Sequence, residues 1–155
     1  MRRLIVVATC LIVVGCASLP PKQKATLALQ TSETALERSH DAERQLCDPT
    51  AHPSQAIRTC KGAEAQTLGL TTDIHLKLAG FYSKAFDLQK KAAEALIVWR
   101  AGDPAPKTLL EYQQVLNEIL LTVQRLLPSK QPVVAQAQEA AKLSEAAVQS
   151  IGGTK

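Results

Sequence analysis

The three residue types of a hydrolase triad stand next to one another at Ser39-His40-Asp41. In such a site the histidine takes the proton of the serine, and the aspartate orients the histidine. The surrounding residues have helical spacing, and consecutive side chains on a helix point about 100° apart, so these three cannot form the relay with one another. The chain also contains no Gly-x-Ser-x-Gly segment, glycine-rich phosphate loop or His-Glu-x-x-His segment. We therefore expect no catalytic residues, no cofactor and no enzymatic activity.

The pair Glu37-x-x-His40 has the spacing of a metal-binding motif on one helix face. It resembles half of the di-iron carboxylate site of ferritin-like proteins, which needs a second copy of the motif and two further inward glutamates. The chain has no second copy. Since Arg44 follows one turn after His40, we expect an ordinary surface pair and no metal.

Cys47 and Cys60 are the two cysteines that remain beyond the first sixteen residues. In an exported protein such a pair is expected to form a disulfide, and closing this loop contributes about 3 kcal/mol in the chain-entropy model. The alternative is a metal site that uses Cys47, His52 and Cys60, but it lacks a convincing fourth ligand.

His52 and His75 have no carboxylate at diagnostic spacing along the chain, so both are expected to be structural. Lys77, Lys84 and Lys91 recur every seven residues and predict a basic stripe on one helix. This stripe is interpreted as a solvated, salt-bridged face, with contact to anionic lipid headgroups or an acidic partner as the alternative.

The N-terminal stretch has the layout of a bacterial export signal, because Arg2-Arg3 precedes the apolar run 4–14. The run is too short to span a bilayer, at roughly 16 Å as a helix against about 30 Å of hydrocarbon. Its ending, Val13-Val14-Gly15-Cys16, resembles the lipobox of bacterial lipoproteins. The alternative is an ordinary cleaved signal ending at Cys16-Ala17-Ser18.

The lipobox resemblance implies a signal peptide over residues 1–15 and a lipid on Cys16, which becomes the mature N-terminus. Ala17 follows this cysteine where a retention signal would place Asp, and in Gram-negative lipoproteins that pattern goes with transfer to the outer membrane. Residues 16–21 then form a short tether, a bundle domain follows over 22–151, and 152–155 are a tail. The expected location is therefore the periplasmic face of the outer membrane.

Composition argues for closely packed helices and against nucleic acid as a partner. The chain has five aromatic residues and is rich in Ala and Leu, which suits helices better than sheets. Its net charge of +4 falls to +2 without Arg2 and Arg3, leaving 16 basic and 14 acidic side chains. A nearly balanced chain with few aromatics lacks both the basic field and the stacking platforms of nucleic-acid binders.

Hydrophobic periodicity predicts four main helices, over 22–47, 73–101, 104–127 and 132–151. A short helix from Ser54 to Cys60 and a weak helix over 61–70, broken near Gly69, are expected between the first two. The seam of the long second helix is predicted from 4,3,4,3 spacing, with Thr72 as its cap and four residues widening one flank. The seam is Ile74, Leu78, Phe81, Ala85, Leu88, Ala92, Ala95 and Trp99, and the flank is Tyr82, Phe86, Ala93 and Ile97.

The expected fold is all-α, an elongated up-and-down bundle of about four helices with one disulfide. A three-helix bundle with a loosely docked first helix is the alternative. Leu110 and Leu121 lie off the main apolar face of their helix, so they are covered by another helix or form a partner contact. In architecture the chain is similar to the helical, disulfide-bearing pilotin lipoproteins that escort secretin subunits, by analogy only. Exclusion lipoproteins are a second possibility.

The expected function is therefore protein–protein contact in the cell envelope, as an assembly, escort or exclusion factor. The alternative is a small-molecule or metal-binding lipoprotein that uses the bundle interior. That alternative needs polar groups pointing into the helix seams, and the sequence pattern predicts almost none.

Overall fold

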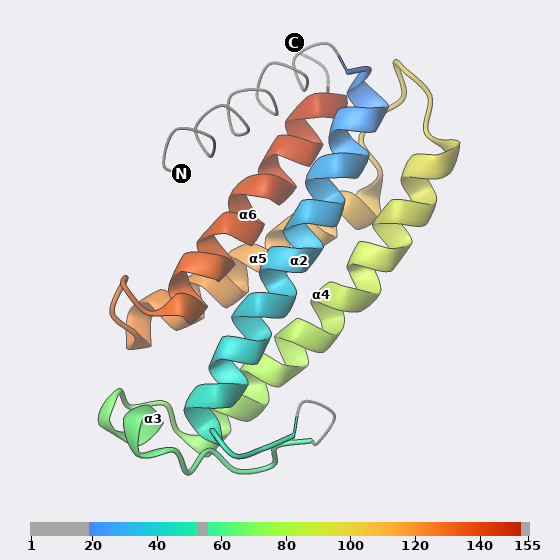
Figure 1. Cartoon of the computed structure of the whole chain (residues 1–155). Coiled ribbons are helices and arrows are strands. Elements are labelled where there is room, and N and C mark those ends of the chain that lie inside the picture. Colours follow the sequence, from blue (N-terminus) through green and yellow to red (C-terminus); the bar gives the residue numbers. More distant parts are fainter. Residues whose placement is uncertain (1–18, 53–55, 153–155) are drawn as a thin grey trace, which may run out of the picture.

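Four long helices run up and down in the computed structural model, which describes residues 19–52 and 56–152 (Figure 1). The long helices are α2 (Pro21–Cys47), α4 (Thr72–Val98), α5 (Lys107–Leu126) and α6 (Pro132–Ile151). A short helix, α3 (Ala63–Thr67), lies in the connection between α2 and α4. No strand occurs within the described ranges. The all-α expectation is confirmed. The proposed signal peptide, Cys16, Ser54 and residues 153–155 lie outside the described residues.

The first helix is an integral part of the bundle, so the alternative with a loosely docked α2 is wrong. Helix α2 packs against α4 and α6, and α5 packs against the same two neighbours. The closest pairing joins α2 and α6, because both present small buried residues to each other, among them Ala25 and Ala35 on α2 and Ala140 and Ala147 on α6. Small side chains allow the two backbones to approach closely.

Five residues of the predicted α4 seam are buried, and at the other three positions the next residue along the chain is buried instead; the five are Leu78, Ala85, Leu88, Ala92 and Trp99. The buried residues are His75, Leu78, Tyr82, Ala85, Leu88, Gln89, Ala92 and Leu96. Ile74, Phe81 and Ala95 are only half-buried, whereas Tyr82 is fully buried and Ile97 is exposed. Two adjacent 3,4 series fit this helix equally well, and polar partners on α2 select the second one.

The predicted helix from 54 to 60 is wrong over the described residues 56–60, which form no regular element. Their backbone groups are used elsewhere: the Ile57 carbonyl accepts from His75 Nε2 at 3.0 Å, and the Cys60 N–H donates to Thr72 Oγ1 at 3.1 Å. The weak helix expected over 61–70 is confirmed only as α3. It ends where Gly69 adopts a φ of +77°, a conformation that glycine takes without cost.

Helix α4 begins one residue before and ends three residues before its predicted bounds. Thr71, and not Thr72, is the cap, since its side chain accepts from the Ile74 N–H at 3.4 Å. At the other end Trp99 leaves the helix, and its indole Nε1–H donates to the Asp103 carbonyl at 3.2 Å, which closes a turn with Gly102 at a φ of +97°. Helix α5 then starts at Lys107.

The lengths and compositions of the described helices have one further consequence. None of them is both long and apolar enough to cross a bilayer.

Candidate functional site

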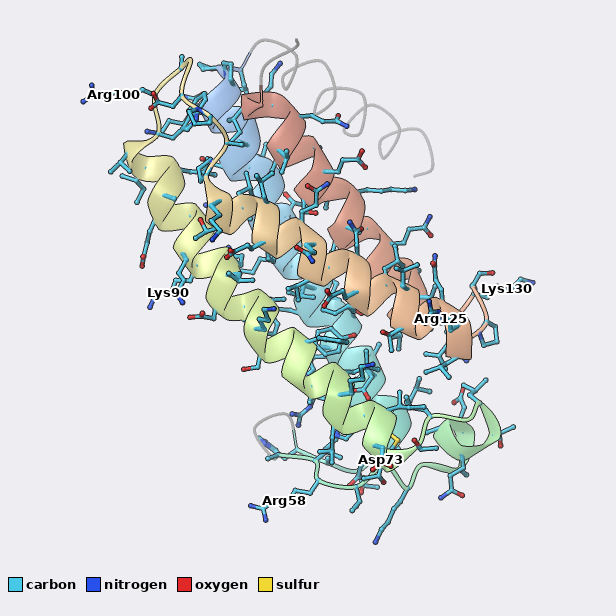
Figure 2. All side chains as sticks on the ribbon, turned by 180° about the vertical axis from the view of Figure 1, so that it is seen from behind. Arg58, Asp73, Lys90, Arg100, Arg125 and Lys130 are labelled. Carbon is cyan, nitrogen blue, oxygen red and sulfur yellow. A yellow bond between two sulfur atoms is a disulfide. The ribbon has the colours of Figure 1, made fainter. Side chains whose placement is uncertain are left out.

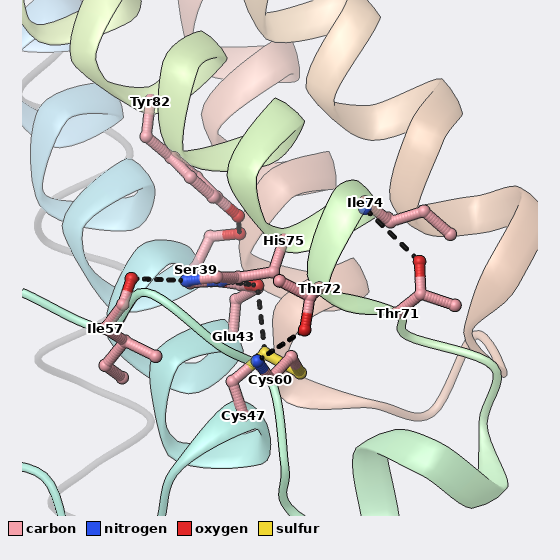
Figure 3. A network of polar contacts seen from close by, with 10 residues as sticks. All are labelled: Ser39, Glu43, Cys47, Ile57, Cys60, Thr71, Thr72, Ile74, His75 and Tyr82. Carbon is pink, nitrogen blue, oxygen red and sulfur yellow. Dashed lines mark hydrogen bonds and ion pairs between the residues drawn. A yellow bond between two sulfur atoms is a disulfide. The ribbon is translucent and has the colours of Figure 1, made fainter.

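A buried acid and a buried histidine face each other between α2 and α4 (Figure 3). Glu43 Oε1 lies 2.7 Å from His75 Nδ1, and both side chains are buried. The other ring nitrogen, Nε2, lies 3.0 Å from the Ile57 carbonyl. The expectation that almost no polar groups point into the helix seams is therefore wrong, because Ser32, Ser39, Glu43, His75, Gln89 and Ser144 are all buried.

The hydrogen-bond geometry fixes how many protons the Glu43–His75 pair holds. A carbonyl oxygen can only accept, so His75 Nε2 carries a hydrogen and donates it to Ile57. The 2.7 Å contact at Nδ1 then needs a second proton, either on the imidazole or on the carboxyl group. Burial raises the pKa of Glu43 above its ordinary value, although its hydrogen bond with His75 opposes this rise. The pair therefore retains a proton inside the bundle.

The disulfide lies next to this pair and holds the loop whose Ile57 carbonyl bonds to His75. Cys47 and Cys60 are bonded, which confirms the predicted disulfide. Cys47 lies one turn after Glu43 on α2, and its sulfur is 3.5 Å from Glu43 Oε1. Since a disulfide sulfur carries no hydrogen, this is a packing contact. The bridge ties this loop to α2, and the Ile57 carbonyl in the loop accepts the hydrogen bond from His75 Nε2.

Two serine–tyrosine pairs, one heptad apart, link three helices each. Ser39 donates to the Val133 carbonyl of α6 at 3.0 Å, and the Tyr82 hydroxyl of α4 lies 2.9 Å from the same serine oxygen. Ser32 likewise donates to the Ala140 carbonyl at 2.8 Å and accepts from Tyr112 of α5 at 3.0 Å.

Each serine hydrogen is used on a carbonyl, so each tyrosine is the donor to its serine. Burial raises the pKa of both tyrosines well above the usual range, and both therefore stay protonated.

His40 packs half-buried against aromatic rings of α4. Its ring centroid lies 4.8 Å from that of Tyr82 and 6.0 Å from that of Phe86. Burial lowers the pKa of His40 below its ordinary value of 6.5, and the nearby Arg44 lowers it further. The side chain therefore favours its neutral form in the folded protein. His40 therefore has a packing role. Its contacts support neither a catalytic triad nor a di-iron site.

The potential metal ligands brought together in the described part of the chain do not form a metal centre. The one group of three such side chains found there is Glu43, Cys47 and His75, with ligand atoms within 4.8 Å of one another. Cys47 is consumed by the disulfide and cannot act as a thiolate ligand. Only a carboxylate and an imidazole remain, and His75 already uses both nitrogens. The proposed Cys47–His52–Cys60 metal site is excluded by the same bond.

The predicted basic stripe lies on the exposed side of α4, with Lys77, Lys84 and Lys91 all exposed. Lys91 Nζ is 2.7 Å from Asp87, and Lys77 Nζ sits 5.7 Å from the centre of the Phe81 ring. These contacts fit the interpretation of a solvated, salt-bridged face. Such exposed pairs contribute little to stability.

Leu110 and Leu121 are exposed, at 44 % and 54 % of their surface, so no helix of the described bundle covers them. Both point away from the bundle on the outer side of α5. They share this side with three exposed polar residues, and together the five form what we call the uncharged α5 stripe: Leu110, Gln114, Asn117, Leu121 and Gln124. At 100° per residue these positions fall within an arc of about 80° and extend over about 21 Å.

A surface stripe without charge is unusual for an exposed helix face. Lys107 and Arg125 border it on one side, and Gln113 borders it on the other. Depletion of charged residues around apolar anchors is typical of the core of a protein–protein interface. The stripe is therefore the best candidate for a functional surface among the described residues.

Sequence reasoning missed the Glu43–His75 pair, although one signal pointed to the glutamate. Glu43 continues the same 4,3 series as Ser32, Leu36 and Ser39 and therefore falls on the inner face of α2. Its charge alone favours the outer face, because charged residues are rarely buried without a partner. The identity of its partner had no sequence signal, because His75 comes from another helix.

Comparison of the chain with protein-family models, curated proteins and solved structures finds no match.

Proposed function

We propose that the protein is a lipid-anchored envelope protein that acts by binding a partner protein through the uncharged α5 stripe. Its role is then that of an assembly, escort or exclusion factor of the cell envelope. The observation that carries the proposal is the exposure of Leu110 and Leu121 on a face that holds no charge. Apolar anchors rimmed by polar residues are the usual centre of a binding interface.

The anchoring part of the proposal rests on Cys16, which carries the lipid and holds the domain at the periplasmic face of the outer membrane. Two sequence features support it: the lipobox-like ending Val13-Val14-Gly15-Cys16 and the Ala17 that follows. The Cys47–Cys60 bridge agrees with it, because structural disulfides form in oxidising compartments such as the periplasm. Stable attachment follows from the two or three acyl chains of a lipoprotein cysteine, since one chain alone binds only marginally.

A photo-crosslinking amino acid placed at position 117 tests the partner-binding face in living cells. Asn117 lies at the middle of the stripe, and Lys84, exposed on α4, provides the matched control position. Light should produce a larger, discrete adduct from position 117 and none from position 84. Adducts from position 84 alone would mean that a different face binds the partner. Peptide mass spectrometry of the adduct identifies the partner.

The anchor is tested separately by the mass of the N-terminal peptide and by Cys16→Ser. The mature chain should begin at an acylated Cys16, and Cys16→Ser should abolish acylation and release or mislocalise the protein. An unmodified N-terminus at Leu19 would show that the export signal is an ordinary cleaved one.

A further inference from the structure

Four other chain segments lie at the end of the bundle at which α2 begins. The first turn of α2, the last turn of α4, the loop 99–106 and the first turn of α5 lie at this end, next to the C-terminal end of α6 (Figure 1). We call it the anchor pole. Cys16 lies only five residues before Pro21, and five residues span at most about 18 Å. If Cys16 carries lipid, the anchor pole is therefore the part of the domain held closest to the bilayer.

The two most exposed large apolar side chains of the described residues lie at this pole. Ile97 and Val98 close α4 and expose 72 % and 76 % of their surface, more than any other large apolar residue within the described ranges. The adjoining Trp99 is turned inward and fixed by its indole bond to the Asp103 carbonyl. Leaving a neighbouring isoleucine and valine in water is costly, and covering them is favourable.

One basic side chain on α2 and one in the loop after α4 adjoin this apolar pair. Lys22 of α2 reaches across to it, and its Nζ donates to the Ile97 carbonyl. Arg100 extends outward from the loop (Figure 2). The described residues of the pole carry four basic groups and one acidic group, namely Lys22, Lys24, Arg100, Lys107 and Asp103. Of these, Lys107 is paired with Glu111, one turn further along α5, at 3.4 Å.

The single acid at the pole is internally engaged, since the Asp103 carboxylate accepts from the Arg100 backbone N–H at 3.1 Å. The pole is therefore positive around an apolar centre. That combination matches an anionic lipid surface, which offers phosphates for the basic groups and acyl chains for the apolar ones.

We propose that the anchor pole docks directly on the lipid bilayer, with Ile97 and Val98 in the interface and Arg100 at the phosphate headgroups. This inference rests on the proposed anchoring through Cys16 and adds an orientation to it. The long helices then stand away from the membrane, the α3 and disulfide end is outermost, and the uncharged α5 stripe faces sideways to a partner.

Fluorescence of Trp99, the only tryptophan of the chain, measures this docking without a label. The protein is produced from the complete sequence and reconstituted into vesicles of phosphatidylethanolamine and phosphatidylglycerol that contain a lipid with a quencher near its headgroup. The unchanged protein should lose Trp99 fluorescence. Ile97→Gln with Val98→Gln should restore it, whereas Leu76→Gln, at the opposite end of α4 and 49 % exposed, should not.

Arg100→Glu provides a second variant that leaves the apolar pair intact. It should reduce quenching in the anionic vesicles and have no effect in neutral phosphatidylcholine vesicles, where quenching of the unchanged protein is already weaker. Circular dichroism of each variant reports that the helices are retained, as expected for exposed positions.

The outcomes separate docking from anchoring. Quenching that is equal in the unchanged protein and the Ile97/Val98 double variant overturns docking, because the tether alone then explains it. Dimers that form in detergent and are lost in the double variant also overturn it, since a second copy then covers the pole. The mass of the N-terminal peptide from the same sample reports lipid on Cys16; quenching without that lipid supports docking and refutes the anchor.

Discussion

Glu43 of α2 and His75 of α4, 32 residues apart in the chain, meet inside the bundle at 2.7 Å. Both would be costly to bury alone. Together with the Ile57 carbonyl they satisfy both ring nitrogens of the histidine and one oxygen of the acid, while Glu43 Oε2 has no hydrogen-bond partner among the described residues. An unpartnered oxygen costs less on a protonated carboxyl group than on a carboxylate, which agrees with a pair that retains its proton.

Removing the Glu43 side chain should destabilise the fold far more than making it a neutral amide. Glu43→Ala leaves His75 Nδ1 buried and unpaired, and we expect a loss of about 3 kcal/mol in the free energy of unfolding. Glu43→Gln should cost clearly less, because its amide N–H can donate to Nδ1. Urea denaturation measures both. Glu37→Ala, on the exposed side of the same helix, is the control and should stay within about 0.5 kcal/mol. Equal losses for Ala and Gln would show that an amide cannot replace the carboxyl group in this contact.

His40 should make the fold sensitive to mild acid. Its pKa is lowered by burial in the folded state, so the unfolded chain binds a proton at a higher pH than the folded protein does. Stability should therefore fall as the pH drops below 6.5, until the folded-state pKa is passed. His40→Gln, which does not titrate, should lose less stability over the same range. Thermal melts of both proteins across this range provide the measurement, and parallel curves would remove His40 as the cause.

Reduction of Cys47–Cys60 should weaken the bundle without unfolding it at room temperature. The bridge closes a short loop and contributes about 3 kcal/mol in the chain-entropy model, whereas the four long helices supply the core. Denaturation with and without a reductant should show this loss. The variant Cys47→Ala with Cys60→Ala should already be less stable and should not respond to the reductant. A response in that variant would place the effect elsewhere.

Replacing Leu110 and Leu121 together by serine should abolish partner binding and preserve the fold. Both side chains are exposed, so the double change should alter the free energy of unfolding by no more than about 1 kcal/mol in all. Leu88→Ala, inside the bundle, should cost about 2–5 kcal/mol and provides the contrast. The adduct from position 117 should disappear only in the serine variant. A serine variant that unfolds would assign these leucines to the core.

The sequence by itself determined the four helices, the bundle and the disulfide. Proline and glycine positions mark the helix ends closely where the chain simply stops being helical, as at Cys47 before Asp48-Pro49 and at Ile151 before Gly152. The helical spacing of Leu109, Leu116 and Val123 on α5 likewise agrees with the buried face of that helix. These features depend on neighbours within one or two turns, which the sequence contains.

Only the tertiary structure decided which of two adjacent series on α4 faces inward. Phe81 and Tyr82 are both large and apolar enough for a core, and the hydroxyl of Tyr82 finds Ser39 while Phe81 has no such partner. The tertiary structure likewise decided the burial of Glu43 and His75. The free-energy cost of burying each side chain is offset only because the two form a hydrogen bond with each other. Such pairings join residues from different helices, and a hydrophobic period along one helix cannot specify them.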